Sequence, residues 1–108
     1  MGLINSSIRV AMLASQKFDL EYKIMLVTQA QMNLSQSVND LMQVGNDYSD
    51  PDSPVVKQLK QREQRLHQLE KKLEMQKAQY QARLEMVTTE IESAKKMRDQ
   101  SIKAAFTY

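Results

Sequence analysis

The sequence contains no cysteine and no tryptophan, and its 108 residues include only two glycines and two prolines. Without cysteine, the chain can form no disulfide and no thiolate metal site, and it has no thiol nucleophile. With four tyrosines and two phenylalanines as its only aromatics, it lacks the bulky side chains that usually fill a compact core. Few glycines and prolines beside 13 glutamines and 8 methionines are typical of long helices. The length allows one structural unit.

Candidate catalytic groups are equally scarce. His67 is the only histidine, and its Gln, Arg and Lys neighbours indicate a solvated helix face. Glu90 and Glu92 diverge on a helix, so they make a poor acid–base pair. The two glycines are too far apart to form a phosphate-binding loop. We therefore expect no catalytic residue, no metal site and no cofactor, and we expect that the protein is not an enzyme.

Turn-forming residues gather in one segment, residues 45–54, which holds both prolines, Pro51 and Pro54, and one glycine. Gly45 suits the left-handed position just after a helix end. Ser53 and Pro54 are typical of a helix N-cap and first turn. The pattern predicts a helix over about 5–44, a turn over about 45–54 and a second helix over about 55–105.

Both predicted helices carry apolar residues at a spacing of seven, which is typical of coiled coils. These seam residues are Leu13, Leu20, Val27, Leu34 and Leu41 in the first helix and Leu59, Leu66, Leu73, Tyr80 and Val87 in the second. Leu69 joins the second series, and Leu84 and Ile91 follow after a slip that resembles a stutter.

The two series mirror each other, because Leu41 with Leu59 and every successive pair to Leu13 with Val87 have residue numbers that sum to 100. The centre of this symmetry falls inside the predicted turn. We therefore predict an all-α fold, an antiparallel two-helix coiled-coil hairpin spanning residues 1–108. The layers between these pairs are partly polar, since Gln31 would face Leu69. An isolated hairpin is then of marginal stability.

A second set of apolar residues lies away from this seam. It comprises Ile8, Phe18, Tyr22, Met25 and Met32 in the first helix, and Met75, Met86 and Met97 with Ala78 and Ala82 in the second. The antiparallel pairing also leaves the C-terminal residues Ile102, Phe106 and Tyr108 without an internal partner, unless this end frays. Soluble monomers rarely expose such stripes. We therefore expect a homo-oligomer, with a closed four-helix dimer as the simplest form.

Charge is divided unevenly: residues 1–54 hold three basic and six acidic residues, whereas residues 55–108 hold twelve and seven. No run of basic residues exceeds two, so we expect no nucleic-acid partner. The longest uncharged stretch, residues 24–39, is too polar to favour a membrane span. The first six residues match the N-myristoylation pattern at Gly2, which keeps a peripheral membrane scaffold as an alternative. No basic leader precedes the first apolar residues, so no cleaved signal is expected.

The turn resembles that of type III secretion needle subunits, since Pro51 and Pro54 form a Pro-x-x-Pro pair followed by Val55, Val56 and Leu59. The tail from Ile102 to Phe106 is similar to the Ile- and Phe-containing tail of that family. The resemblance covers about ten residues at the turn and a few at the end. The second helix is longer than the family's, and the N-terminus lacks the family's Trp-bearing head. The resemblance implies a hairpin subunit that stacks into a hollow extracellular filament, with residues 102–108 packed between subunits.

Besides the membrane scaffold, two functions remain open from the sequence. The first is a structural subunit of a self-assembling filament or oligomer, secreted to the cell surface or beyond without a cleaved signal. The second is a cytoplasmic coiled-coil adaptor or export chaperone, a dimer that binds the helices of other proteins. A filament needs two different, complementary surfaces, whereas an adaptor needs one.

Overall fold

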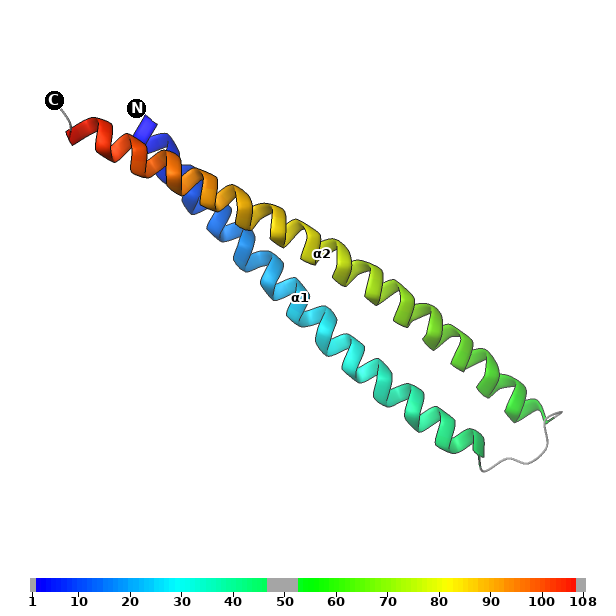
Figure 1. Ribbon diagram of the computed structural model, residues 1–108. Helices are drawn as coiled ribbons and strands as arrows, with labels where there is room; N and C mark the ends of the chain where they lie inside the picture. Colours follow the sequence, from blue (N-terminus) through cyan, green and yellow to red (C-terminus); the bar gives the residue numbers. More distant parts are fainter. Residues whose placement is uncertain (1, 47–52, 107–108) are drawn as a thin grey trace. The chain divides into compact units, whose positions relative to one another are not determined.

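The computed structural model describes residues 2–46 and 53–106, and these form two α-helices with no strand between them. Helix α1 spans Gly2–Asn46 and helix α2 spans Pro54–Phe106. They run in opposite directions (Figure 1). The predicted all-α helical hairpin is confirmed.

Packing divides the hairpin into two compact units. Unit 1 pairs the start of α1 with the end of α2 and consists of Met1–Ile24 and Gln79–Tyr108. Unit 2, Met25–Ala78, pairs the end of α1 with the start of α2. Each unit has its own part of the seam.

The end of α1 differs from the prediction at Gly45. The helix continues to Asn46, and no glycine among the described residues has a positive φ. The prediction of a left-handed Gly45 after the helix end was therefore wrong. Gly45 keeps ordinary helical backbone because the helix runs past it, and nothing lies within 4 Å of the position a Cβ would take. Pro51 lies outside the described residues.

The start of α2 follows the prediction. The helix begins at Pro54, and the backbone N–H of Val55 donates to the Ser53 hydroxyl oxygen at 3.3 Å. The N–H of Lys57 donates to the Ser53 carbonyl at 3.1 Å, which closes the first helical turn. Ser53 is thus the N-cap, and it satisfies one of the backbone donors that a helix start leaves without a partner.

The core of unit 1 is a cluster of Leu13, Ile91 and Ala94, with Val10 and Val87 packed against it. Ala94 is the most deeply buried of these, at 1% exposure. Leu13 is therefore covered by residues up to two turns beyond Val87, its partner in the symmetric pairing. The slip in the apolar series at Leu84 and Ile91 accounts for this, because it moves the apolar seam of α2 from Val87 to Ile91, one turn further along the helix, and Ala94 follows in the next turn. Leu20 of this unit is buried as well.

The seam of unit 2 is less well covered. Val27 and Val38 are buried, whereas Leu34, Leu41, Leu59, Leu66 and Leu73 are half-buried. Lys77 donates from Nζ to Oε1 of Gln31 at 3.5 Å, and Leu69, the predicted partner of Gln31, is 48% exposed. No large side chain among the described residues of the hairpin is fully buried.

Candidate interaction surfaces

The polar groups of α2 form a surface row rather than a pocket. His67 lies 3.6 Å from Glu63 through Nε2 and 3.4 Å from Glu70 through Nδ1. All three are on one helix, at spacings of three and four residues, and His67 is exposed. Among the described residues, no group of three or more His, Cys, Asp or Glu side chains is placed to hold a metal ion. These contacts at spacings of three and four residues therefore stabilise the helix α2 itself.

Neither α1 nor α2, over residues 2–46 and 53–106, combines the length and the hydropathy needed to cross a membrane.

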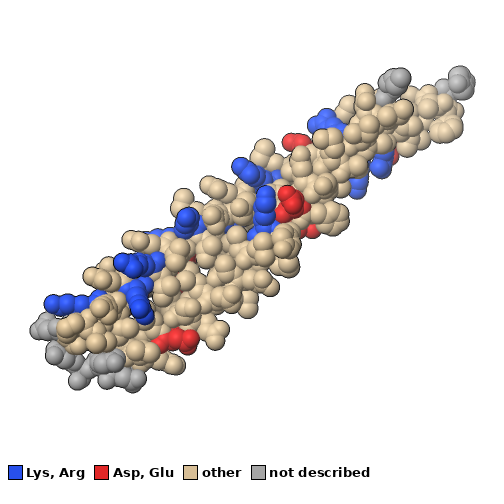
Figure 2. Space-filling view, turned by 180° about the vertical axis from the view of Figure 1, so that it is seen from behind, with Lys and Arg blue, Asp and Glu red and all other residues tan. Residues whose placement is uncertain are grey.

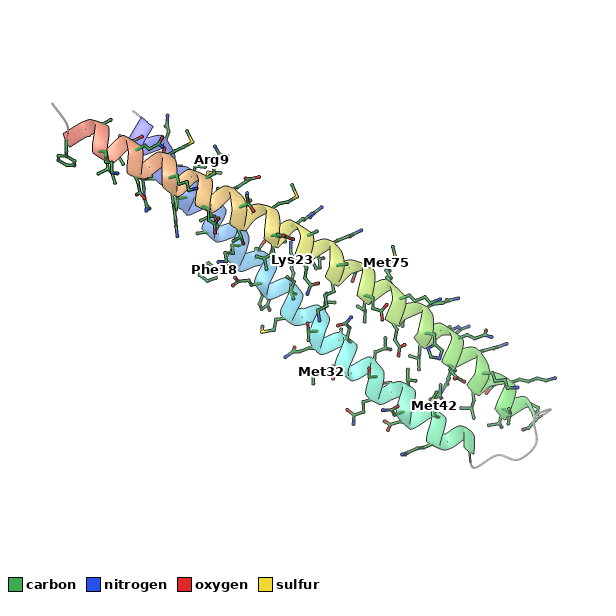
Figure 3. The ribbon with its side chains drawn as sticks, viewed as in Figure 1. Arg9, Phe18, Lys23, Met32, Met42 and Met75 are labelled. Carbon is green, nitrogen blue, oxygen red and sulfur yellow. The ribbon has the colours of Figure 1, made fainter. Side chains whose placement is uncertain are left out.

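The side of α1 turned away from the seam carries a continuous series of exposed, uncharged residues. Their spacing alternates between four and three over the whole helix, which is the spacing of a coiled-coil seam. We call this series the α1 outer stripe; it consists of Ile4, Ile8, Ala11, Ser15, Phe18 and Tyr22 in unit 1, and Met25, Gln29, Met32, Gln36, Asn39 and Gln43 in unit 2. Phe18 is 72% exposed and Met32 68%. Both side chains project away from α2 (Figure 3).

The charged residues of α1 all lie off this stripe. Two of its ion pairs are local to the helix: Lys17 with Glu21 at 4.0 Å and Lys23 with Asp19 at 3.8 Å. A helix face that meets only water usually carries charged residues. Twelve successive stripe positions without a charge are therefore unusual for a face that meets only water.

Helix α2 also carries a series of exposed, uncharged residues, but their spacing differs from that of the α1 outer stripe. The α2 outer stripe consists of Met75, Ala78, Ala82, Met86, Thr89, Ser93, Met97, Gln100 and Ala104, all exposed and all uncharged. Its spacing is three, four and four, a repeat of eleven residues that winds little or in a right-handed sense. Met75 projects away from α1 (Figure 3). The residues of this stripe are smaller than those of the α1 outer stripe, since five of the nine are Ala, Ser or Thr.

A shallow hollow lies on the α2 outer stripe within unit 1. It is lined by Ala82, Glu85, Met86, Thr89 and Glu90. The Thr89 hydroxyl donates to the Glu85 carbonyl at 3.0 Å, so it needs no further hydrogen-bond partner. Ala82 and Met86 therefore offer contacts to an apolar side chain, and the carboxylates of Glu85 and Glu90 flank them.

In unit 2 the exposed side of α2 is cationic instead. Five exposed residues form this cationic face: Lys57, Lys60, Arg65, Lys71 and Lys72. None of the five cations has an acidic residue four positions away, although Lys60 and Lys71 each have a glutamate three positions on, Glu63 and Glu74. In the described chain none of them forms an ion pair. Figure 2 shows Lys and Arg side chains along this half of α2.

The structure separates the residues predicted from the sequence into two sets. All ten predicted seam residues are buried or half-buried. The predicted interface residues are exposed and fall on the two outer stripes, apart from those of the tail: Ile102 is 37% exposed and Phe106 82%. Tyr108 lies outside the described residues. Sequence reasoning missed Ala94 and the uncharged polar members of both stripes. The unbroken three-four spacing was the signal for the α1 outer stripe.

The geometry defines a class, that of two-helix hairpins whose outer faces carry long uncharged stripes. Comparison of the chain with protein-family models, with curated proteins and with solved structures found no match. The function must therefore be argued from the surfaces themselves.

Proposed function

We propose that this protein is a non-enzymatic structural subunit that assembles with copies of itself into a helical filament or oligomer. The observation that carries the proposal is the α1 outer stripe, a second coiled-coil series that the chain's own α2 does not cover. Burying a large apolar side chain contributes about 1.5–3 kcal/mol. Phe18, Tyr22 and Met32, each more than half exposed, therefore favour association.

The presence of two different outer stripes favours an assembly that continues. A contact between like surfaces closes a dimer, whereas a contact between unlike surfaces forms a ring or an open filament. In unit 1, α1 and α2 each present an uncharged stripe, and the two differ in side-chain size. Each copy can then bind one neighbour through α1 and another through α2.

A finer form of the proposal is a filament outside the cell that resembles a secretion needle. The Pro-x-x-Pro pair at Pro51 and Pro54 and the apolar tail support it, as does the hairpin fold. Phe106, at 82% exposure, is available for packing between subunits. A cytoplasmic location is the alternative.

The test is light scattering with negative-stain imaging of the purified protein over a concentration series. We expect large species or filaments that grow with concentration. Phe18→Ser should raise the concentration needed for assembly, whereas Met12→Ser should not. Met12 is similarly exposed, at 61%, but lies roughly 120° around the helix from Phe18. A monomer at all concentrations would contradict self-assembly.

The cationic face of unit 2 favours a second candidate, a coiled-coil adaptor or export chaperone that binds an acidic helix. Five unpaired cations repel a copy of the same surface and attract an opposite charge. The matching probe is an amphipathic peptide with a Glu stripe, followed by fluorescence anisotropy at low and high salt. Salt-sensitive binding that Lys57→Glu with Lys60→Glu abolishes, together with a closed dimer, would favour the adaptor over the filament.

A further inference from the structure

We propose that Phe18 of one copy inserts into the hollow on α2 of the next copy, among Ala82, Met86 and Thr89. Neighbouring copies then contact each other through the α1 outer stripe on one side and the α2 outer stripe on the other. The inference rests on the proposed self-assembly and specifies its contact.

The two surfaces are complementary in size. In unit 1 the α1 outer stripe presents Phe18, the most exposed of its large apolar side chains, with Tyr22 one turn further on. The α2 outer stripe of the same unit is built largely from small residues, and the hollow occurs where Ala82 and Thr89 flank Met86. Large side chains that enter spaces between small ones are the basis of close helix packing.

The alignment of the two helices places these features at one level. Within unit 1, Lys23 Nζ lies 5.9 Å from the centroid of the Tyr80 ring, and a Cβ on Gly2 would lie 3.2 Å from the Ser101 hydroxyl oxygen. Residue numbers that sum to about 103 are thus level in the hairpin. A second copy that lies alongside in the same orientation brings Phe18 level with the centre of the hollow.

The same alignment gives Tyr22 a small counterpart, because Tyr22 becomes level with Ala82. Ile8 falls between Ser93 and Met97 and so has a small residue on one side. A contact between two α1 stripes would instead bring Phe18 and Tyr22 against equally large side chains. The unlike contact therefore packs better than the like one.

Charge is compatible with this contact. Neither stripe buries a charged side chain, so the contact leaves no ion without water or a partner. On the rim of the hollow, Glu85 and Glu90 form no ion pair among the described residues. Near Phe18, Lys17 pairs with Glu21 at 4.0 Å and Lys23 pairs with Asp19 at 3.8 Å, so the charges beside Phe18 are balanced within α1. The contact therefore depends on apolar packing rather than on ion pairs.

The area is of the right order for a specific contact. A buried aromatic side chain covers about 150–250 Å², and Phe18 and Tyr22 are 72% and 56% exposed. Together they would bury roughly 250 Å², about a third of the roughly 800 Å² that each partner of a standard interface buries. Ile4 and Ile8, both more than half exposed, add to this share, and Met86 and Met97, also more than half exposed, contribute to the share of the other copy.

Because the chain has no cysteine, disulfide trapping can test the contact without background. Tyr22→Cys and Ala82→Cys are made separately, mixed, allowed to assemble and oxidised. We expect a disulfide between the two different variants, whereas each variant alone gives little. The double variant should form a ladder of covalent oligomers on a non-reducing gel. Tyr22→Cys homodimers as the main product would overturn the proposal in favour of a like contact.

A second measurement uses the size of the hollow. Ala82→Phe fills it, and Phe18→Ala removes the side chain that enters it. Each should raise the concentration needed for assembly at least tenfold with unchanged helicity by circular dichroism, and Met12→Ala should leave it unchanged. Assembly of Ala82→Phe and Phe18→Ala at the wild-type concentration would overturn the contact while self-assembly stands. A wild-type protein that stays monomeric would instead refute the proposed function itself.

Discussion

Replacing Leu13 by Ala tests the seam at its best-packed point. Leu13 is 6% exposed and lies in the cluster with Ile91 and Ala94. The change removes three carbon groups at about 0.8 kcal/mol each, or about 2.4 kcal/mol. Ala94 is too short to fill the space, so a cavity adds to this cost, and Leu→Ala changes in cores cost about 2–5 kcal/mol. We expect a loss of about 2–3 kcal/mol, because a two-helix seam lets water reach the gap.

The matched control is the neighbouring Met12→Ala. Met12 is 61% exposed, so its replacement should change the free energy of unfolding by no more than about 0.5 kcal/mol. Thermal melts by circular dichroism, below the assembly concentration, compare the two. At about 4–8 °C per kcal/mol, Leu13→Ala should lower Tm by about 10–20 °C. If the two variants melted together, the placement of the seam on Leu13 would be refuted.

Two smaller changes test the helix ends. Gly45→Ala should stabilise the hairpin by about 0.5 kcal/mol in thermal melts, because Gly45 has helical backbone and open space around its Cβ position. A loss of stability would instead indicate that Gly45 adopts a left-handed backbone conformation, as the sequence had predicted. Ser53→Ala should cost about 1 kcal/mol, because it removes the hydroxyl that accepts from Val55 N–H, whereas Ser53→Asp, which keeps an acceptor, should melt like the wild type. Equal melting of the Ala and Asp variants would show that the cap contributes nothing.

The hairpin and its seam could be predicted from the sequence because both depend on local signals. Period-seven leucines mark the buried side of each helix, and Ser53 with Pro54 marks a helix start. The alignment of the two helices was harder to predict, since a heptad series slides along its partner without changing which residues are apolar. The stutter after Tyr80 determines this alignment, because it places Ile91 and Ala94, rather than Val87 alone, against Leu13.

The surfaces were predictable only in part. Exposed Met and aromatic residues marked the outer stripes, but their polar members, such as Gln29 and Gln36, look like ordinary solvated residues one at a time. They become informative once all are exposed at the spacing of a seam. The cationic face was missed for a different reason: Lys and Glu are interleaved along the sequence of α2, which is the usual pattern of a helix with local ion pairs. Only the absence of ion pairs to these five cations, among the described residues, reveals the face.

The exposed methionines of the outer stripes also make these surfaces sensitive to oxidation. Met25, Met32, Met75, Met86 and Met97 are all more than half exposed. A peroxide converts such a thioether to a sulfoxide, which is polar and packs poorly against an apolar partner. Oxidation before assembly would weaken contacts through both stripes, whereas contact between copies would shield the sulfur atoms that it covers. Because methionine sulfoxide reductases reverse this lesion, these side chains would link the proposed assembly to the redox state of the surroundings.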